Sequence, residues 1–158
     1  MINIIKENFK RAIFALIFSI ITIGTLSFLS FETPYGLFLV GSFGSSMVLL
    51  FGYPESPFAQ PKNVFFGHFI TSLIGVLTLE FLPLDQFLQI AIAVGIGIFL
   101  MIILGVTHPP AGGNPIIIVL ASASYSFLLN PIIIGSVMII VYAVIINRFI
   151  LKKNYPSN

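Results

Sequence analysis

Three long stretches of the sequence contain no charged residue: Ala12–Phe31, Thr33–Pro54 and Gln86–Asn147. A helix that crosses a bilayer needs about 20 mostly apolar residues at a rise of about 1.5 Å each, so the last stretch alone is long enough for three crossings. The apolar residues form continuous runs, whereas a strand of a membrane barrel would alternate them with polar residues. Because the backbone must satisfy its own hydrogen bonds inside hydrocarbon, the pattern predicts helices.

Short polar or proline-rich breaks divide these runs into about six helical segments. The predicted segments are 12–31, 34–52, 64–82, 87–106, 116–129 and 131–151, separated by breaks at 32–33, 53–63, 83–86, 107–115 and Asn130. The fifth segment covers about 21 Å at the helical rise, against a hydrocarbon core of about 30 Å. We therefore expect either a half-helix here or a preceding break that dips into the membrane.

Composition agrees with a membrane protein and excludes a soluble domain. Of the 158 residues, 58% are apolar and 8% are charged, whereas a soluble domain has about 25% charged residues. The first apolar run lacks a small-residue cleavage site and is longer than the core of a signal peptide, which predicts a retained helix. The absence of cysteine excludes disulfides and thiol chemistry. We expect an all-α membrane protein with a single polytopic domain over residues 1–158.

The distribution of charge predicts the orientation of the chain. If all six segments cross, every basic residue falls on one side of the membrane: Lys6, Lys10, Arg11, Lys62, Arg148, Lys152 and Lys153. The acidic residues Glu32, Glu80 and Asp85 fall at or near the other side. Because Lys and Arg are retained in the cytoplasm, both termini and both long breaks are expected on the cytoplasmic side of the cell (inner or plasma) membrane.

A weak internal repeat follows from a shift of 52 residues, which places Ser56-Pro57-Phe58-Ala59 over His108-Pro109-Pro110-Ala111. Each copy would contain two helices and a proline-rich break, with residues about 12–63 in the first copy and about 64–115 in the second. The C-terminal helices, about 116–151, would follow. Because both copies start on the same side, the repeat would be parallel, related by an axis along the membrane normal.

The two proline-rich breaks contain the candidate chemistry, because each leads directly into a helix. Asn114 followed by Pro115 is a strong helix start, since Asn accepts from first-turn amides and proline suits the first helical position. Asn63 before Val64 is a plainer version of this signal. A helix N-terminus carries unsatisfied N–H groups and a partial positive charge, which favours an anion.

Other residues at the breaks favour an anion as well. Gly112 and Gly113 would allow the backbone to approach a ligand closely, and Lys62, His68 and His108 supply basic groups. Histidine, with an unperturbed pKa of about 6.5, would also couple anion entry to a proton. The plainer alternatives are that the breaks are ordinary turns, that Lys62 is a topological anchor and that His68 hydrogen-bonds a neighbouring helix.

Small residues recur on several predicted helices. Three serines, Ser42, Ser45 and Ser46, are expected to let helices pack closely more than to contact a substrate. The pairs Ala91/Gly95 and Ala93/Gly97 have the small-xxx-small spacing of close helix contacts. Such faces allow a homo-oligomer.

At the breaks the sequence resembles the HPP family of integral membrane proteins, named for the triplet present here as His108-Pro109-Pro110 within Thr-His-Pro-Pro-Ala-Gly-Gly-Asn-Pro. The first half agrees through Gly-Ser-Phe-Gly-Ser-Ser from Gly41, Pro-Glu-Ser-Pro-Phe-Ala-Gln-Pro-Lys-Asn over 54–63, and Gly67-His68. The resemblance covers roughly residues 11–151 and implies a small transporter-like membrane protein. Some relatives in cyanobacteria and plastids are associated with nitrite transport, and family descriptions often count four membrane spans.

We therefore expect a transporter or channel for a small inorganic anion, with nitrite as the best single candidate, and no enzyme. The predicted substrate site has two halves, one with His108, Pro109, Pro110, Gly112, Gly113 and Asn114, the other with Lys62, Asn63 and His68. The alternatives are an intramembrane hydrolase that uses a His-activated group, and a non-transporting membrane subunit or scaffold. No cofactor, metal or nucleic acid is expected, since two histidines and Glu55 do not form a recognisable metal site.

Overall fold

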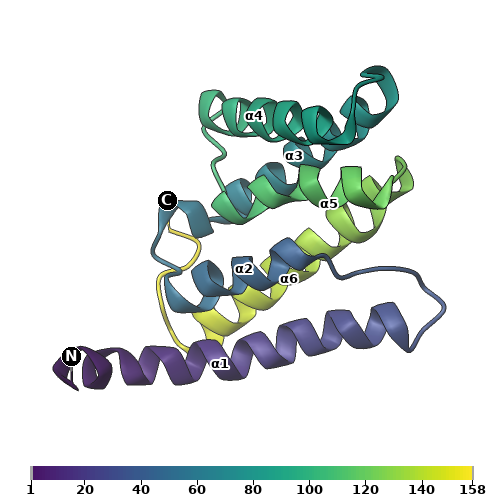
Figure 1. Cartoon of the computed structure of the whole chain (residues 1–158). Coiled ribbons are helices and arrows are strands. Elements are labelled where there is room, and N and C mark those ends of the chain that lie inside the picture. Colours follow the sequence, from purple (N-terminus) through teal and green to yellow (C-terminus); the bar gives the residue numbers. More distant parts are fainter. Residues whose placement is uncertain (1, 158) are drawn as a thin grey trace.

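The computed structural model describes residues 2–157, and every regular element in that range is helical (Figure 1). The long α-helices are α1 (Ile2–Phe31), α3 (Pro61–Phe81) and α4 (Gln86–Ile103). The last helix consists of α6 (Ile134–Val144) with π-helical turns at both ends, η4 (Leu128–Ile133) and η5 (Ile145–Ile150). The shorter elements are α2 (Gly41–Met47), the π-helical turn η1 (Val48–Gly52), α5 (Asn114–Ala121), and the 3-10 turns η2 (Pro57–Ala59) and η3 (Pro109–Gly113).

Four of these helices are long and apolar enough to cross a membrane, within the part of the chain that is described. They are Asn8–Phe31, Pro61–Phe81, Gln86–Ile103 and Leu128–Ile150, and the shorter apolar helices are Gly41–Gly52 and Pro109–Ala121. The six predicted helical segments are therefore present as four long and two short helices. The predicted all-α membrane fold is confirmed.

The second segment is shorter than the sequence predicted, because residues 36–40 form no helix, Val40 is extended and α2 begins at Gly41, not at Pro34. The backbone amides of Phe38 and Leu39 donate to the hydroxyl of Ser30 at 2.9 and 3.1 Å. This hydroxyl therefore holds the non-helical chain beside the end of α1.

The fifth segment is also short, as its length of 14 residues suggested. α5 ends at Ala121, and Ser122 follows in the left-handed region with φ 48°. Such a residue stops a helix, since the left-handed conformation ends the ladder of i to i−4 hydrogen bonds.

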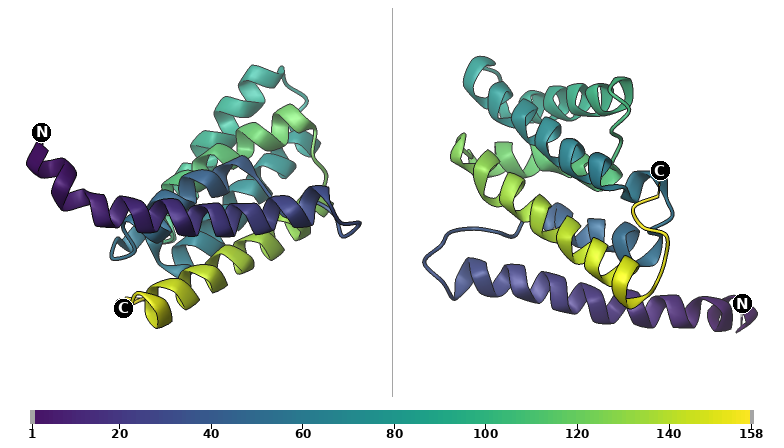
Figure 2. Two further views of the ribbon diagram at one scale, coloured as in Figure 1. Left: turned by 90° about the horizontal axis from the view of Figure 1, so that it is seen from below. Right: turned by 180° about the vertical axis from the view of Figure 1, so that it is seen from behind.

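The six segments run in alternating directions, so both termini and both proline-rich breaks lie at one end of the molecule, called here the break end (Figures 1 and 2). This arrangement agrees with the alternation of sides used to interpret the charges. Placement of the break end in the cytoplasm stays a prediction.

The predicted internal repeat is not confirmed. It would pair α2 and η1, of 7 and 5 residues, with α4 of 18 residues. It would also pair α1, of 30 residues, with α3 of 21 residues. These differences in length leave only the order of helices and breaks in common.

Helix α3 approaches its neighbours closely through glycines. A Cβ at Gly67 would lie 2.7 Å from Cβ of His108, and one at Gly75 would lie 3.1 Å from Cα of Pro115. On the partner helix α4, a Cβ at Gly97 would lie 3.2 Å from Cγ2 of Thr71. α3 is thus the element against which α4, α5 and the second break pack.

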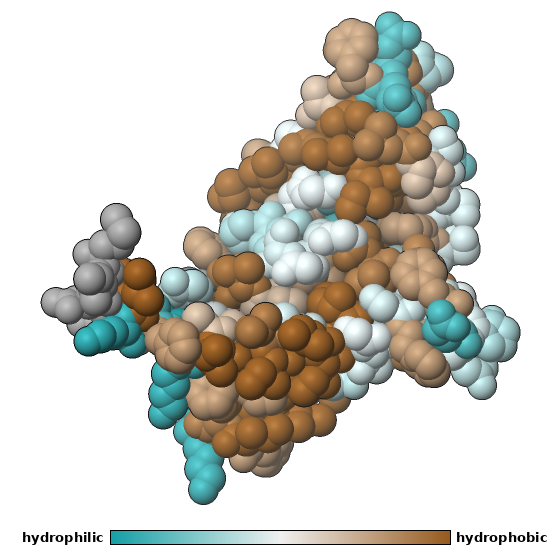
Figure 3. Space-filling view, turned by 60° about the horizontal axis from the view of Figure 1, so that its bottom comes forward, coloured by the Kyte–Doolittle hydropathy of each residue, from teal (hydrophilic) through white to brown (hydrophobic). Residues whose placement is uncertain are grey.

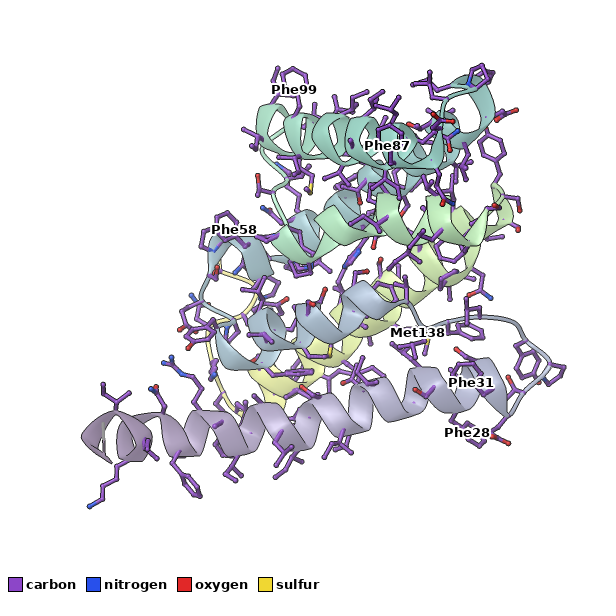
Figure 4. The ribbon with its side chains drawn as sticks, viewed as in Figure 1. Phe28, Phe31, Phe58, Phe87, Phe99 and Met138 are labelled. Atoms are coloured by element: carbon purple, nitrogen blue, oxygen red, sulfur yellow. The ribbon has the colours of Figure 1, made fainter. Side chains whose placement is uncertain are left out.

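Apolar side chains cover most of the face drawn in Figure 3, and the most hydrophilic residues lie toward its margins. Among the exposed apolar residues are Phe87 and Phe99 of α4, at 68% and 60% exposure. Phe99 points away from the other helices (Figure 4). Because lipid tails are apolar, such a surface suits the hydrocarbon of a bilayer and not water.

Candidate functional site

Seven polar side chains from four elements gather in the interior, where none is more than 6% exposed. Helix α2 supplies Ser42 and Ser46, α3 supplies His68, Thr71 and Ser72, the second break supplies His108, and α5 supplies Asn114. We call these residues the polar cluster. Burying so many polar groups costs free energy unless each one is hydrogen-bonded.

Local structure places each element of the polar cluster. Ser42 and Ser46 are four residues apart on one helix, so their side chains share a face of α2. His68, Thr71 and Ser72 are three or four apart on α3 and share a face in the same way.

The prolines of the second break prevent a regular helix before α5, and His108 has extended backbone at φ −133° and ψ 97°. Gly67 then lets His108 lie directly against α3.

Asn114 is the hub of the polar cluster. Its Oδ1 accepts a hydrogen bond from the hydroxyl of Ser42 at 2.5 Å. Its Nδ2 donates to Nδ1 of His68 at 3.0 Å and to the hydroxyl of Ser72 at 2.9 Å, with the hydroxyl of Thr71 at 3.4 Å. One amide therefore connects α5 to both α2 and α3.

Ser46 joins the two histidines of the chain. Its Oγ lies 3.1 Å from Nε2 of His68 and 2.8 Å from Nε2 of His108. The two imidazole rings meet edge to face, with centroids 4.9 Å apart. Nδ1 of His108 lies 2.8 Å from the carbonyl oxygen of Phe58 in the first break, at the break end (Figure 4). The polar cluster therefore includes contacts from both proline-rich breaks.

Two backbone carbonyls fix the direction of these hydrogen bonds, because a carbonyl oxygen only accepts. Nδ2 of Asn114 lies 3.3 Å from the carbonyl of His68, so the amide nitrogen is on this side and Nδ1 of His68 accepts. The proton of His68 is then on Nε2, which donates to Ser46. Nδ1 of His108 donates to Phe58, which leaves its Nε2 to accept from Ser46. In this arrangement both imidazoles are neutral.

Three of the predicted site residues, His68, His108 and Asn114, meet in the polar cluster. Asn114 does so differently from the prediction, because it does not cap α5. It is the first residue of that helix, with φ −61° and ψ −44° and no side-chain hydrogen bond to the first turn. Its side chain bonds to α2 and α3 instead.

The other predicted site residues lie outside the polar cluster. Lys62 is exposed, and Asn63 donates to the carbonyl of Thr107 at 2.9 Å. Helix α3 begins at Pro61, so Asn63 lies inside the helix and the predicted helix start at Val64 is wrong by three residues. In the second break, no other part of the protein lies close to Gly112 or Gly113, since a Cβ at either position would meet no atom within 4 Å. Pro109 is exposed and Pro110 is half-buried.

Four members of the polar cluster were not among the predicted site residues: Ser42, Ser46, Thr71 and Ser72. Ser42 and Ser46 were expected to serve helix packing. The available signal was their spacing, because hydroxyls at i and i+4 on an otherwise apolar helix need partners on a neighbouring element. Glu55 lies 3.9 Å from the guanidinium of Arg11, and that guanidinium lies over the ring of Tyr53.

At the end of the molecule opposite the breaks, a cavity of about 420 Å³ approaches the polar cluster. It is lined by Val76, Leu79 and Glu80 of α3 and by residues 122–125, and Glu80 accepts a hydrogen bond from Tyr125 there. Beneath it, Val76 packs with Ile118 and Leu128, which are 3%, 0% and 8% exposed. We call these three residues the apolar layer.

The apolar layer is one helical turn thick. On α3, Ser72 of the polar cluster, Val76 of the layer and Glu80 of the cavity follow at intervals of four residues, and so do Asn114, Ile118 and Ser122 on and after α5. Four residues of helix rise about 6 Å. The cavity and the polar cluster are thus separated by a single layer of apolar side chains.

The C-terminal residues pack over the first break. Tyr155 is 1% exposed, and its hydroxyl donates to the carbonyl of Ala59 at 2.8 Å. The amide of Ser157 donates to Oε1 of Gln60, also at 2.8 Å. Burial raises the pKa of Tyr155, because the charged phenolate loses its hydration. Composition and hydropathy gave no sign of this contact.

A second cavity of about 700 Å³ lies away from the polar cluster, between α1 and the α2–η1 helix, and most of its lining is apolar. Neither this cavity nor the one near Glu80 is lined by Ser46, His68 or His108. Within residues 2–157, no three His, Cys, Asp or Glu side chains gather to hold a metal ion. The groups that the polar cluster presents are hydroxyls, an amide and two imidazoles, which can form hydrogen bonds and transfer protons.

The helical fold, the lipid-compatible surface and the four candidate spans define a multi-pass membrane protein. Residues 5–156 match the transmembrane region of the HPP family, and the chain belongs to this family. The resemblance inferred from the His108-Pro109-Pro110 motif is confirmed.

Two curated proteins of Dictyostelium discoideum, both named only as transmembrane proteins, are similar to the chain. One is 34% identical over 125 residues, which cover 75% of this chain and 44% of the relative. The other is 33% identical over 127 residues, which cover 76% of this chain and 41% of the relative. The chain thus spans less than half the length of these relatives. No solved structure matches it.

Proposed function

We propose that this protein transports a small inorganic anion across a cell membrane, with nitrite as the candidate substrate, and that the polar cluster is the substrate site. The observation that carries the proposal is the polar cluster itself, which is buried, rich in donors and in contact with both breaks. Ionisable and polar residues inside a membrane protein are costly, and they commonly mark the path of a substrate.

The donors of the polar cluster suit a small anion. The Asn114 amide, the hydroxyls of Ser42 and Ser46, and the imidazole N–H of His68 already donate to oxygen or nitrogen atoms at 2.5–3.1 Å. An oxyanion that enters would replace one of these internal acceptors and take over its hydrogen bonds. Neither described cavity is lined by the histidines, and this favours a small substrate.

Short routes to both ends of the molecule support transport over a purely structural role. On one side, the apolar layer of Val76, Ile118 and Leu128 separates the polar cluster from the cavity at Glu80. On the other side, His108 contacts the carbonyl of Phe58, whose side chain is 41% exposed at the break end. A buried site between these two approaches suits a carrier that opens to the two sides in turn.

Nitrite uptake into proteoliposomes tests the proposal. We expect uptake above that of protein-free vesicles, and a loss of at least about tenfold in a His108→Ala, Asn114→Ala double variant, because two of the main hydrogen-bonding groups are removed. Gly112→Ala is the matched control, since a Cβ there meets nothing within 4 Å. Uptake by the folded double variant at the wild-type rate would remove the polar cluster from the transport path.

The contacts of Ser46 favour a second candidate, an intramembrane hydrolase. Its hydroxyl lies 2.8 Å from Nε2 of His108, and the Phe58 carbonyl orients that ring from the other side, which is the geometry of an activated nucleophile. Neither described cavity is lined by Ser46, and this disfavours access for an ester. A fluorophosphonate probe discriminates the two functions, because covalent labelling of Ser46 supports the hydrolase and an unlabelled, flux-competent protein supports the carrier.

A further inference from the structure

We propose that the polar cluster carries one proton together with each anion, and that the hydroxyl of Ser46 is the switch that admits this proton. The inference rests on the proposed transport function and adds to it the form in which the substrate crosses, as an anion plus a proton without net charge.

The first argument is the absence of a fixed positive charge near the polar cluster. The described residues of α2, η1, η2, α4, η3, α5 and α6, which surround the cluster, include no charged residue. Helix α3 carries Lys62 and Glu80, both exposed and toward its two ends, besides His68. An unpaired charge in a low-dielectric interior is unfavourable. A bound anion would therefore need a mobile positive charge, and the two imidazoles are the groups that can take a proton.

The second argument is that Ser46 has two acceptors for its hydroxyl proton. In the neutral network this hydroxyl donates to Nε2 of His108 at 2.8 Å. The carbonyl oxygen of Ser42 lies 3.1 Å from the same Oγ. Rotation about the Cβ–Oγ bond therefore moves the proton from one acceptor to the other without displacing any heavy atom.

This rotation makes room for one proton. Once the Ser46 hydroxyl donates to Ser42, Nε2 of His108 is free to take the proton that enters with the anion and become an imidazolium. Nε2 of His68 and Nε2 of His108 then both donate to the oxygen of Ser46, whose two lone pairs accept them. Release of the proton to water and the reverse rotation restore the neutral network, so no atom is gained or lost over a cycle.

The same network excludes a second proton. Nδ1 of His68 accepts from Nδ2 of Asn114 at 3.0 Å. If this Nδ1 were protonated, its N–H would face the N–H of Asn114, and neither group could accept the other's hydrogen bond. A second proton would also place two cationic rings with their centroids 4.9 Å apart, where like charges repel. The geometry therefore gives one proton for each anion.

Proteoliposomes with a clamped membrane potential test the coupling. With the outside one pH unit more acidic, cotransport of one nitrite with one proton accumulates nitrite up to about tenfold inside, since one pH unit is a tenfold ratio of protons. Protein-free vesicles measure the background diffusion of nitrous acid, and an entrapped pH dye reports the proton that enters with nitrite. We expect accumulation and internal acidification above this background.

Variants of Ser46 test whether its hydroxyl controls the proton coupling or only stabilises the fold. Ser46→Ala should lower proton-driven accumulation from about tenfold toward onefold, and Ser46→Thr should restore it because the hydroxyl returns. Ser45→Ala is the matched control, since Ser45 is exposed one position away on the same helix. Circular dichroism shows whether each variant is folded.

The possible results separate the proton coupling from the anion transport on which it rests. Nitrite uptake without internal acidification overturns the proton coupling and leaves the anion transport standing. Absence of nitrite uptake by the folded protein overturns the proposed function, and the coupling with it. Proton-coupled uptake that is unchanged in folded Ser46→Ala overturns the assignment of the switch to Ser46.

Discussion

Gly67 tests how strictly α3 and the second break must fit together. A methyl carbon at this position would lie 2.7 Å from Cβ of His108 and 3.3 Å from the carbonyl oxygen of Val106. Carbon atoms pack at about 3.5–4.0 Å, so Gly67→Ala must move His108 away from α3 by about 0.8–1.3 Å. That displacement breaks or weakens the hydrogen bonds of His108 to Ser46 and Phe58, both 2.8 Å long.

The expected loss of stability combines two terms. Overpacking costs about 1–3 kcal/mol, and two weakened hydrogen bonds add about 1 kcal/mol each, for a total of about 3–5 kcal/mol. At about 2–4 °C per kcal/mol for a chain of this size, the Tm in detergent should fall by roughly 6–20 °C. Nitrite uptake should fall at least about tenfold, because the histidine pair loses its alignment.

Thermal melts followed by circular dichroism, together with proteoliposome flux, measure both effects. Gly95→Ala is the matched control, because a Cβ at this exposed helical position meets no atom within 4 Å. It should raise the stability slightly, since alanine favours a helix over glycine by about 0.5–1 kcal/mol. If Gly67→Ala melted and transported like Gly95→Ala, the close fit of His108 against α3 would be refuted.

Three further changes test other parts of the structure. Asn114→Ala should lower the free energy of unfolding by about 2–4 kcal/mol in a denaturant titration, because Ser42, Ser72 and His68 lose their shared partner, and a loss below about 1 kcal/mol would contradict its role as the hub. Glu80→Gln should raise the initial rate of anion uptake about threefold, since a unit charge about 7 Å from the entering anion repels it even in water; a lower rate would contradict entry through that cavity. Burial raises the pKa of Tyr155, so its stabilisation of the tail is complete below its unfolded pKa of about 10 and is lost as pH rises through the higher folded pKa. Protease cleavage after Lys152 and Lys153 should therefore increase above about pH 10 in the wild type, whereas Tyr155→Phe should show no such pH dependence in its cleavage once the change in protease activity is subtracted.

The long helices were predictable because hydrocarbon leaves the backbone few alternatives. A charge-free run of about 20 residues in lipid must be helical, and α1, α3 and α4 end within a few residues of charged or proline-rich breaks. Helix α2 was not predictable at its start. Residues 36–40 are as apolar as a helix, and it is the hydroxyl of Ser30 that holds Phe38 and Leu39 in a non-helical chain.

The candidate site was partly predictable for a similar reason. His68, His108 and Asn114 stand out because polar side chains next to membrane helices need partners. Their partners Ser42 and Ser46 did not stand out, because serine also serves close helix packing. The assignment of Lys62, Gly112 and Gly113 assumed that the helix starts themselves form the site. The structure instead brings together side chains of α2 and α3 with His108 of the second break and Asn114 at the start of α5, and the α3 members lie more than one turn away from Lys62.

The most direct test of the central claim uses the fact that the chain has only two histidines, both in the polar cluster. Nitrogen NMR of histidine-labelled protein in lipid would report each imidazole during a nitrite titration. If the polar cluster is the substrate site, the Nε2 signals of His68 and His108 shift together and saturate, and Gly112→Ala leaves the titration unchanged. Flux-competent protein whose two histidine spectra do not respond to nitrite would contradict the account.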